Sequence, residues 1–283
     1  MVVAQRIEEV RREVRAARAC GQRVGLVPTM GALHEGHASL LRAARADGGL
    51  AVASIFVNPT QFGPTEDLSQ YPRAIERDLE ICRREGVGLV FAPSAAEMYP
   101  AGFATTVHVA GMTDKMCGAL RLGHFGGVCT VVAKLLNIVL PDVAYFGEKD
   151  AQQLAIIRQM VKDLNFPVEI RGCPTVRDPD GLALSSRNVH LSPTERRQAL
   201  ALSASLAEAR EAVRAGERDA GRLAEGVRQR LKAAEGVDLQ YVAVVDPDTL
   251  EDLAQVAETV LVAVAAKVGA TRLIDNVLLR GLS

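Results

Sequence analysis

A short turn between an apolar run and a helical pattern constrains the fold of this chain more than any other feature. The turn spans Val27–His37 and contains two glycines and two histidines. The apolar run before it, Arg23–Val27, predicts a buried strand that ends at Pro28, and the residues after His37 repeat apolar positions at helical spacing. The glycines allow left-handed or closely packed backbone. The stretch therefore predicts a strand, a tight turn and a helix in direct succession.

His34 and His37 fall at the N-terminus of the predicted helix. Backbone N–H groups and the positive end of the helix dipole bind anions there, and two imidazoles three residues apart can reach the same anion. Capping of a surface helix explains either histidine taken alone. Two histidines in one turn bracketed by glycines favour a polyphosphate site.

Further apolar runs alternate with helical patterns up to about residue 140. An Arg/Glu/Ala-rich helix is expected from residue 4, strands are expected at 50–57, 88–92 and 143–146, and helices are expected at 73–85 and 128–139. This alternation predicts an α/β fold, a Rossmann-like doubly wound parallel sheet with right-handed crossovers. Ligands bind beyond the carboxyl ends of the strands in such sheets. We therefore expect the segments 29–37, 58–63 and 147–153 to share one crevice.

The composition changes after Pro174, where turn residues at 177–181 precede a long Ala/Arg/Glu-rich helical stretch. Ser192 is predicted to cap that stretch, with Pro193 at the first helical position and Glu195 at the third. The stretch continues to about residue 235, and the apolar runs 239–245, 259–265 and 271–276 predict a small sheet packed against it. We therefore predict a Rossmann-like nucleotide-binding domain over 1–175 and a smaller α+β domain over 176–283.

Composition argues against several classes of protein. A net charge of −1 from 33 basic and 34 acidic residues disfavours general binding to nucleic acid or to anionic membranes, since both need a basic surplus. Charges also interrupt every apolar run before it could span a bilayer. Five cysteines without C-x-x-C spacing predict buried free thiols of a reducing compartment, neither a disulfide framework nor a zinc site. The first residues lack a signal-peptide pattern, so we expect a cytoplasmic protein.

Two further segments carry side chains suited to phosphate. Lys149 follows a predicted strand, and an ammonium at the carboxyl edge of a sheet suits a phosphate group. Ser185, Ser186 and Arg187 offer two hydroxyls and a guanidinium, a set that can clamp phosphate oxygens. A solvated loop would also explain the acidic neighbours of Lys149, and a second helix cap would explain the serines.

Other polar residues have structural explanations of similar weight. Asn58 and Gln61 end a predicted strand with two amides that could bind a small polar molecule, although a plain Asn-Pro turn explains them equally well. His124 precedes a predicted helix and could simply cap it. Glu76 and Asp78 could approach a metal ion, but charge on a helix surface explains them better.

The histidine motif is similar to the His-x-Gly-His signature of the nucleotidyltransferase and class I synthetase superfamily. The longer string Pro28–His37 resembles the pantothenate synthetase (pantoate–β-alanine ligase) family, whose other motifs occur here in the same order, at 57–62, 123–125, 146–150 and 185–188. The sequence departs from the family at Leu184, where Met is usual, and at Leu122, where Pro is usual. The resemblance spans most of the chain.

The resemblance implies a two-step ligase that uses ATP and Mg²⁺. The carboxylate of pantoate attacks the α-phosphorus of ATP to give pantoyl adenylate and pyrophosphate, and the amine of β-alanine then attacks the acyl carbon. A homodimer through the larger domain is also implied, whereas the metal ligands stay open. The alternatives are a nucleotidyltransferase that stops after nucleotide transfer and a non-catalytic nucleotide-binding module. The set of motifs in one chain favours the ligase.

The resemblance further implies roles for individual residues. Gln61 and Gln153 hold pantoate, together with Thr29 and Met30. The residues implied in catalysis are His34, His37, Lys149, Ser185, Ser186 and Arg187. Those implied at ATP are Met30, His34, His37, Gly147, Lys149, Asp150, Val176, Leu184, Ser185, Ser186 and Arg187, with Asp150 at the ribose. Asn58, Arg121 and His124 are further candidates, the last two near the nucleotide or the substrate carboxylate.

Overall fold

The structure is a computed structural model that describes residues 1–63, 68–69, 71–256 and 258–280. The chain forms two compact units. The larger unit contains residues 1–114, 118–148 and 156–174, and the smaller unit contains 115–117, 149–155 and 175–283. The division at 175/176 drawn from the sequence places both short inserted segments in the first domain. In the structure, Lys149, Asp150 and Gln153 therefore belong to the smaller unit.

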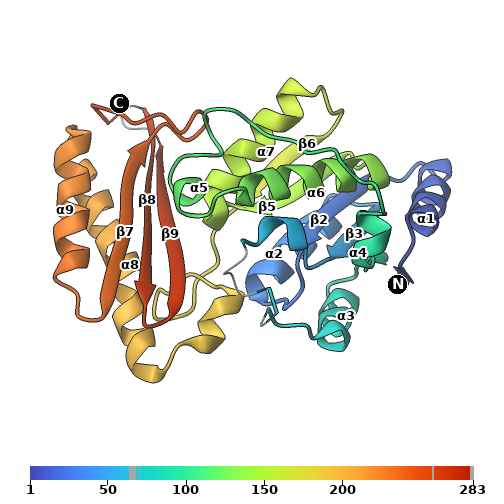
Figure 1. Ribbon diagram of the computed structural model, residues 1–283, viewed down its shortest axis with the longest axis horizontal. Helices are drawn as coiled ribbons and strands as arrows, with labels where there is room; N and C mark the ends of the chain where they lie inside the picture. The colour runs from blue at the N-terminus through green and yellow to red at the C-terminus, as the bar shows by residue number, and fades with distance from the viewer. Residues whose placement is uncertain (64–67, 70, 257, 281–283) are drawn as a thin grey trace. The chain divides into compact units, whose positions relative to one another are not determined.

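The larger unit is built on a parallel sheet with the strand order β1-β4-β3-β2-β5-β6. Its strands are β1 (Val2–Ala4), β2 (Val24–Thr29), β3 (Leu50–Ile55), β4 (Leu89–Phe91), β5 (Val143–Gly147) and β6 (Glu169–Cys173), of which Figure 1 labels β2, β3, β5 and β6. The strand order changes direction between β2 and β5, which is the position where doubly wound sheets bind ligands. The predicted fold class is confirmed.

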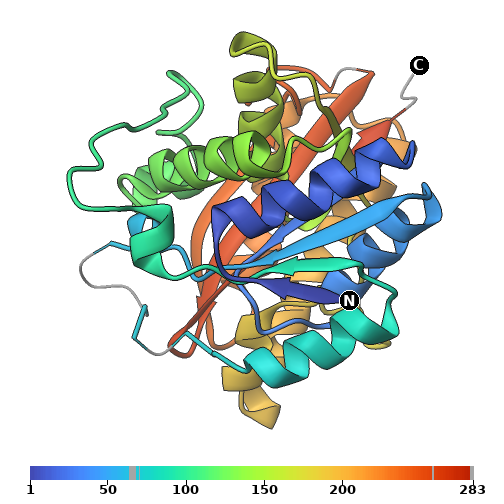
Figure 2. The same cartoon turned by 90° about the vertical axis from the view of Figure 1, so that its right-hand side faces the viewer.

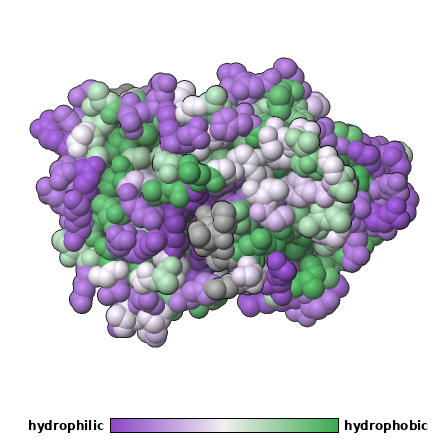
Figure 3. All heavy atoms as spheres, in the orientation of Figure 1, coloured by the Kyte–Doolittle hydropathy of each residue, from purple (hydrophilic) through white to green (hydrophobic). Residues whose placement is uncertain are grey.

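Helices cover both faces of this sheet. They are α1 (Ile7–Ala19), α2 (Glu35–Ala46), α3 (Ile75–Arg84), α6 (His124–Val139) and α7 (Ala151–Asp163), with the short helices α4 (Ala95–Met98) and α5 (Cys117–Leu120). Figure 2 shows α1 and α6 over one face and α3 over the other. Hydrophilic residues lie on the outer side of α1 in the larger unit and of α9 (Ala220–Lys232) in the smaller unit (Figure 3), as expected for amphipathic surface helices.

Several boundaries differ from those predicted. β2 continues through Pro28 to Thr29, because β5 pairs only with Gly25 and Leu26 and leaves that side of Pro28 without a strand partner. The first helix begins at Ile7, since Val2–Ala4 instead forms β1 beside β4. No strand was predicted at β6, whose residues are mostly half-buried or exposed and so lack a continuous apolar run.

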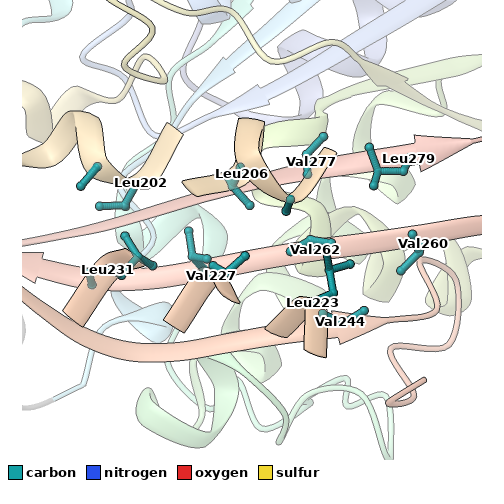
Figure 4. Close-up of a cluster of buried hydrophobic side chains, with 14 of the residues drawn as sticks. Leu202, Leu206, Leu223, Val227, Leu231, Val244, Val260, Val262, Val277 and Leu279 are labelled. Atoms are coloured by element: carbon teal, nitrogen blue, oxygen red, sulfur yellow. The ribbon is translucent and has the colours of Figure 1, made fainter. Parts of the chain in front are cut away.

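The smaller unit contains an antiparallel sheet of β7 (Val237–Val245), β8 (Thr259–Val268) and β9 (Thr271–Arg280). The predicted sheet packed against helices is confirmed, and Figure 4 shows the apolar core between them, which includes Leu202, Leu206, Leu223, Val227, Leu231 and Val262. The long helical stretch is two helices, α8 (Pro193–Arg214) and α9, because Gly216 adopts φ +105° and Asp219 caps a new helix. Ser192, Pro193 and Glu195 start α8 as predicted.

Within the described ranges, no helix combines the length and apolarity needed to span a membrane.

All five cysteines are free thiols, and four of them are buried. Burial raises the pKa of Cys82 to about 11 and that of Cys129 to about 12, so these thiols stay protonated near neutral pH. The prediction of buried thiols is wrong for Cys20, which is exposed because it ends α1 at the surface.

Candidate active site

The two histidines build the N-terminus of α2, as predicted. His34 is the N-cap residue, and its Nδ1 accepts a hydrogen bond from Gly36 N at 3.1 Å. His37 lies at the third helical position, and its Nδ1 accepts from His34 N at 3.3 Å. The two rings are 4.1 Å apart between centroids. The pair therefore forms a capping box in which imidazoles take the parts usually played by Ser or Thr and Glu.

These hydrogen bonds fix the protonation of both rings. A ring nitrogen that accepts a hydrogen bond carries no proton, so the neutral ring has its proton on the other nitrogen. In His34 and His37 the accepting atom is Nδ1, which makes each Nε2 an N–H donor. The expectation of open backbone N–H groups at this helix end needs correction, because the imidazoles already bind two of the first ones.

Gln61 and Asn58 lie next to this turn, at the carboxyl end of the neighbouring strand β3. Both side chains are buried, with exposed fractions of 7% and 1%. Asn58 Nδ2 donates to Gln61 Oε1 at 3.0 Å, and Gln61 Nε2 contacts Met30 Sδ at 3.0 Å. The segments 29–37 and 58–63 therefore meet, as predicted. A plain Asn-Pro turn does not explain a buried amide pair that reaches across to the β2 turn.

Arg121 and His124 converge on the same segment. His124 Nδ1 lies 2.7 Å from the carbonyl oxygen of Gln61, and Arg121 Nη1 lies 2.9 Å from His124 Nε2. The capping explanation for His124 is wrong, since Gly123 is the N-cap residue of α6 and adopts φ +79°. A Cβ on Gly127 would lie 2.4 Å from Thr60 O, so this glycine lets α6 pack directly on the Gln61 segment.

The smaller unit brings the predicted cations together. Lys149 and Arg187 line one small hollow with Ser185. Ser185 Oγ also accepts from Arg187 N at 3.2 Å and caps the short 3₁₀ helix Ser186–His190, so the capping alternative holds for this serine as well. The loop around Lys149 is tied to β9 because Asn276 Nδ2 donates to Lys149 O at 2.8 Å.

The same hollow contains a cation that the sequence analysis missed. Arg272 on β9 lines it, and its guanidinium is oriented by Gln240 Oε1 at 2.7 Å and by Cys117 Sγ at 3.3 Å. A charged residue within a predicted apolar strand was the available signal. Asp275, also on β9, is buried and pairs with Arg177 through two hydrogen bonds of 2.7 and 2.8 Å, which order the start of the second domain.

The remaining candidates have distinct surroundings. Gln152 is buried and ties two segments of the smaller unit together, accepting from Cys117 N at 3.0 Å and donating to Lys115 O at 2.8 Å. Gln153 is half-buried and makes no side-chain hydrogen bond within the described part of the chain, which leaves its amide available to a ligand. Val176 O accepts from Leu184 N at 3.0 Å, so these two predicted ATP contacts lie side by side.

The structure contradicts the interpretation of Asp78 as a charge on a helix surface. Its side chain is 1% exposed, and its carboxylate accepts hydrogen bonds from Ala32 N and Leu33 N, whereas Glu76 on the same helix is exposed as expected. Neither residue belongs to a metal cluster, since no group of three His, Cys, Asp or Glu side chains suited to a metal occurs in the residues described.

A larger, open hollow of about 600 Å³ lies at the other end of the sheet, beside the amino ends of β2, β3 and β4. Half of its lining residues are glycines, the others include Arg23, Arg45 and Asp47, and none of the candidate residues lines it. Because doubly wound sheets bind ligands at the carboxyl ends of their strands, the candidate site stays with the α2 turn.

Comparisons with known proteins agree over the whole chain. A family model described as pantoate-beta-alanine ligase matches residues 2–278. The chain is 54% identical over 278 residues to a pantothenate synthetase of Thermoanaerobacter sp. (strain X514), with 98% of both chains covered. It is 55% identical over 279 residues to that of Moorella thermoacetica, with 99% of both chains covered.

Two solved structures extend the comparison. A pantothenate synthetase from Thermus thermophilus superposes with a TM-score of 0.93 at 46% identity, covering 98% of this chain and 99% of the other. A pantoate-beta-alanine ligase from Francisella tularensis, complexed with beta-gamma ATP and beta-alanine, superposes with a TM-score of 0.77 at 35% identity, covering 98% and 97%.

Proposed function

Because the chain belongs to the pantoate–β-alanine ligase family, it is an ATP-dependent ligase of pantoate and β-alanine, and we propose that it works through a pantoyl adenylate. In the first step a carboxylate oxygen of pantoate attacks the α-phosphorus of ATP, and pyrophosphate leaves. In the second step the amine of β-alanine attacks the acyl carbon, AMP leaves, and the amine loses a proton to give pantothenate. The observation that carries the proposal is the pair of histidines whose Nδ1 atoms accept hydrogen bonds at the α2 cap, from which we infer that each Nε2 is a donor.

The adenylation step needs charge stabilisation more than covalent catalysis. Negative charge grows on the phosphorus centre and on the leaving pyrophosphate, where preorganised donors and cations lower the barrier. We assign the donors to His34 and His37 and the cations to Lys149 and Arg187, with the hydroxyls of Ser185 and Ser186 beside them. Gly147, Asp150, Val176 and Leu184 complete the proposed ATP contacts, with Asp150 at the ribose.

Pantoate is assigned to the buried amides beside the α2 turn. Gln61 is buried next to Met30 and is assigned to pantoate with Thr29 and Met30, and Gln153 is proposed to contribute from the smaller unit. Asn58 orients the side-chain amide of Gln61, and His124 contacts the main-chain carbonyl oxygen of Gln61. Arg121 is proposed to act through His124, at 2.9 Å from its Nε2.

Three further features belong to this proposal. Mg²⁺ is proposed to enter on the phosphates of ATP, because Mg²⁺ sites of this type use few carboxylates and the described residues hold no three-ligand cluster. The Ser185–Arg187 segment is proposed to close over bound ATP and exclude the water that would hydrolyse the adenylate. The ligase is proposed to act in the cytoplasm as a homodimer formed through the larger unit, and a light-scattering mass near 30.2 kDa would contradict the dimer.

Isotope exchange tests the adenylate directly. Pantoate and ATP alone should support exchange of labelled pyrophosphate into ATP, because the first step is complete and reversible without the amine. AMP should be released in quantity only when β-alanine is also present. Exchange that requires β-alanine would overturn the stepwise route, and AMP release with neither acid present would point to a different nucleotide transfer.

A further inference from the structure

A buried carboxylate supports the turn that carries the catalytic histidines. Asp78 lies on α3 with 1% of its surface exposed, and its two oxygens accept hydrogen bonds from Ala32 N at 2.9 Å and from Leu33 N at 2.7 Å. No Lys or Arg in the described chain forms an ion pair with it. Both hydrogen bonds come from one turn, so the side chain serves that turn and not the rest of α3.

The turn has a backbone conformation that needs such support. Gly31 and Ala32 both adopt left-handed φ values, +83° and +50°, and a left-handed alanine persists only where its surroundings hold it. Successive N–H groups from Gly31 to His34 all donate to side chains. Gly31 N donates to Thr29 Oγ1 at 3.2 Å, the next two donate to Asp78, and His34 N donates to His37 Nδ1. Asp78 therefore accepts two of these four hydrogen bonds.

Burying this carboxylate is unfavourable by itself. Burial raises the pKa of Asp78, and the hydrogen bonds from Leu33 and Ala32 and the charge of Arg77 act in the opposite direction. A buried charge without an ion-pair partner persists where hydrogen bonds to it define a local structure. Here the structure defined is the two residues immediately before the α2 N-cap, His34.

From these contacts we propose that Asp78 is a positioning residue for adenylation, holding the Gly31–Leu33 turn so that His34 and His37 present their Nε2–H groups at a fixed place. The proposal rests on the proposed function of the two histidines. Gly31 is part of the same device, because a Cβ at this residue would lie 2.9 Å from Asp78 Oδ2 and 3.2 Å from Ile55 Cγ2. The site thus requires a glycine and a carboxylate that are far apart in the sequence.

Three variants test this role. Asp78→Asn keeps the volume of the side chain but turns an N–H group toward a backbone N–H, and Glu76→Gln removes an exposed carboxylate from the same helix as a matched control. Gly31→Ala disturbs the contact from the other side. Amide hydrogen exchange at residues 32 and 33 should become faster in the first and third variants only. Unchanged hydrogen exchange at residues 32 and 33 in Asp78→Asn would overturn the proposal, whatever the function of the turn.

The kinetic readout separates positioning from other roles. Pantoate-dependent pyrophosphate exchange should fall by about tenfold to a hundredfold in Asp78→Asn, the scale of a small misplacement of reacting groups, while ready-made pantoyl adenylate still reacts with β-alanine near the parent rate. The double variant with Gly31→Ala should lose less than the product of the two single losses, because both act on one contact. If the loss of pyrophosphate exchange in the double variant equals the product of the two single losses, the positioning role is overturned. It is also overturned if added Mg²⁺ restores the exchange rate of Asp78→Asn.

Failure of the proposed role of the two histidines has a different signature. If His37→Ala leaves pyrophosphate exchange intact, the histidines are not the adenylation donors, and that part of the proposed function fails, while hydrogen exchange at residues 32 and 33 still reports on Asp78. If His37→Ala abolishes pyrophosphate exchange and Asp78→Asn speeds hydrogen exchange in the turn without slowing adenylation, the proposed role of the histidines stands and the positioning role of Asp78 is overturned.

Discussion

The two nitrogens of His37 are predicted to have separable functions, which three substitutions can distinguish. Nδ1 accepts from His34 N and completes the cap of α2, whereas Nε2–H is the proposed hydrogen-bond donor to the phosphates during adenylation. An asparagine places its amide oxygen near the position of Nδ1, and a glutamine places its amide nitrogen near that of Nε2. Alanine removes both groups.

The magnitudes follow from these contacts. Loss of the cap acceptor should lower the free energy of unfolding by about 1 kcal/mol in His37→Ala and His37→Gln, whereas His37→Asn should stay close to the parent. Loss of one preorganised donor should lower the rate of adenylation by about 10²–10³ in His37→Ala and His37→Asn. His37→Gln should keep more adenylation activity than either of these two, so the order of stability and the order of activity should differ.

Urea unfolding measures the first quantity, and pantoate-dependent pyrophosphate exchange measures the second. The reaction of supplied pantoyl adenylate with β-alanine serves as the control, since the phosphate charge addressed by His37 is gone once pyrophosphate leaves. An asparagine variant that adenylates like the parent would refute the assignment of the donor to Nε2. An equal loss in both half-reactions would mean that His37 organises the whole site or acts on the amine.

Three other perturbations test separate parts of the structure. Gln61→Ala and Gln153→Ala should each weaken pantoate binding by roughly 1.5–3 kcal/mol, the scale of a hydrogen bond to a charged group, and calorimetry showing parental affinity in both would place the pocket elsewhere. Hydrogen exchange through residues 182–189 should slow when ATP or a non-hydrolysable analogue binds, and no change would rule out closure of this segment. Asp47 accepts from the Tyr145 hydroxyl, which holds the pKa of Asp47 below its ordinary value. Its stabilising contribution is therefore present above the unfolded-state pKa of about 3.9 and is lost as pH falls below it. The stability gap between the parent and Asp47→Asn should narrow under acid titration, and a constant gap would contradict this reasoning.

Local patterns were sufficient to predict most of the strands, the main helices and the position of the histidines. Continuous apolar runs between helical patterns have few structural solutions, and the glycine-bracketed turn at 31–36 fixes where one helix starts. The second domain was also predictable, since Ser192, Pro193 and Glu195 form a complete capping signal. These features depend on residues close together in the sequence.

The features that sequence analysis missed depend on distant residues. Burial of Asp78 arises only because α3 packs beneath the α2 turn, and its helix alone looks like an ordinary charged surface helix. Continuation of β2 through Pro28 depends on the short pairing with β5. Arg272 belongs to the cation hollow only because β9 folds back beside the Lys149 loop.

Capping and the proposed phosphate binding, which the sequence presented as alternatives for the histidines, are compatible in one geometry. A ring whose Nδ1 caps the helix must be neutral, and only then does its proton reside on Nε2. In the proposed function, His34 and His37 therefore contribute hydrogen bonds to the triphosphate but no net charge. Neutralisation of its negative charge has to come from cations, and the candidates gathered in one hollow are Lys149, Arg187 and Arg272, all in the smaller unit. If the proposed roles hold, adenylation should therefore need the cations of the smaller unit as well as the histidines of the larger one.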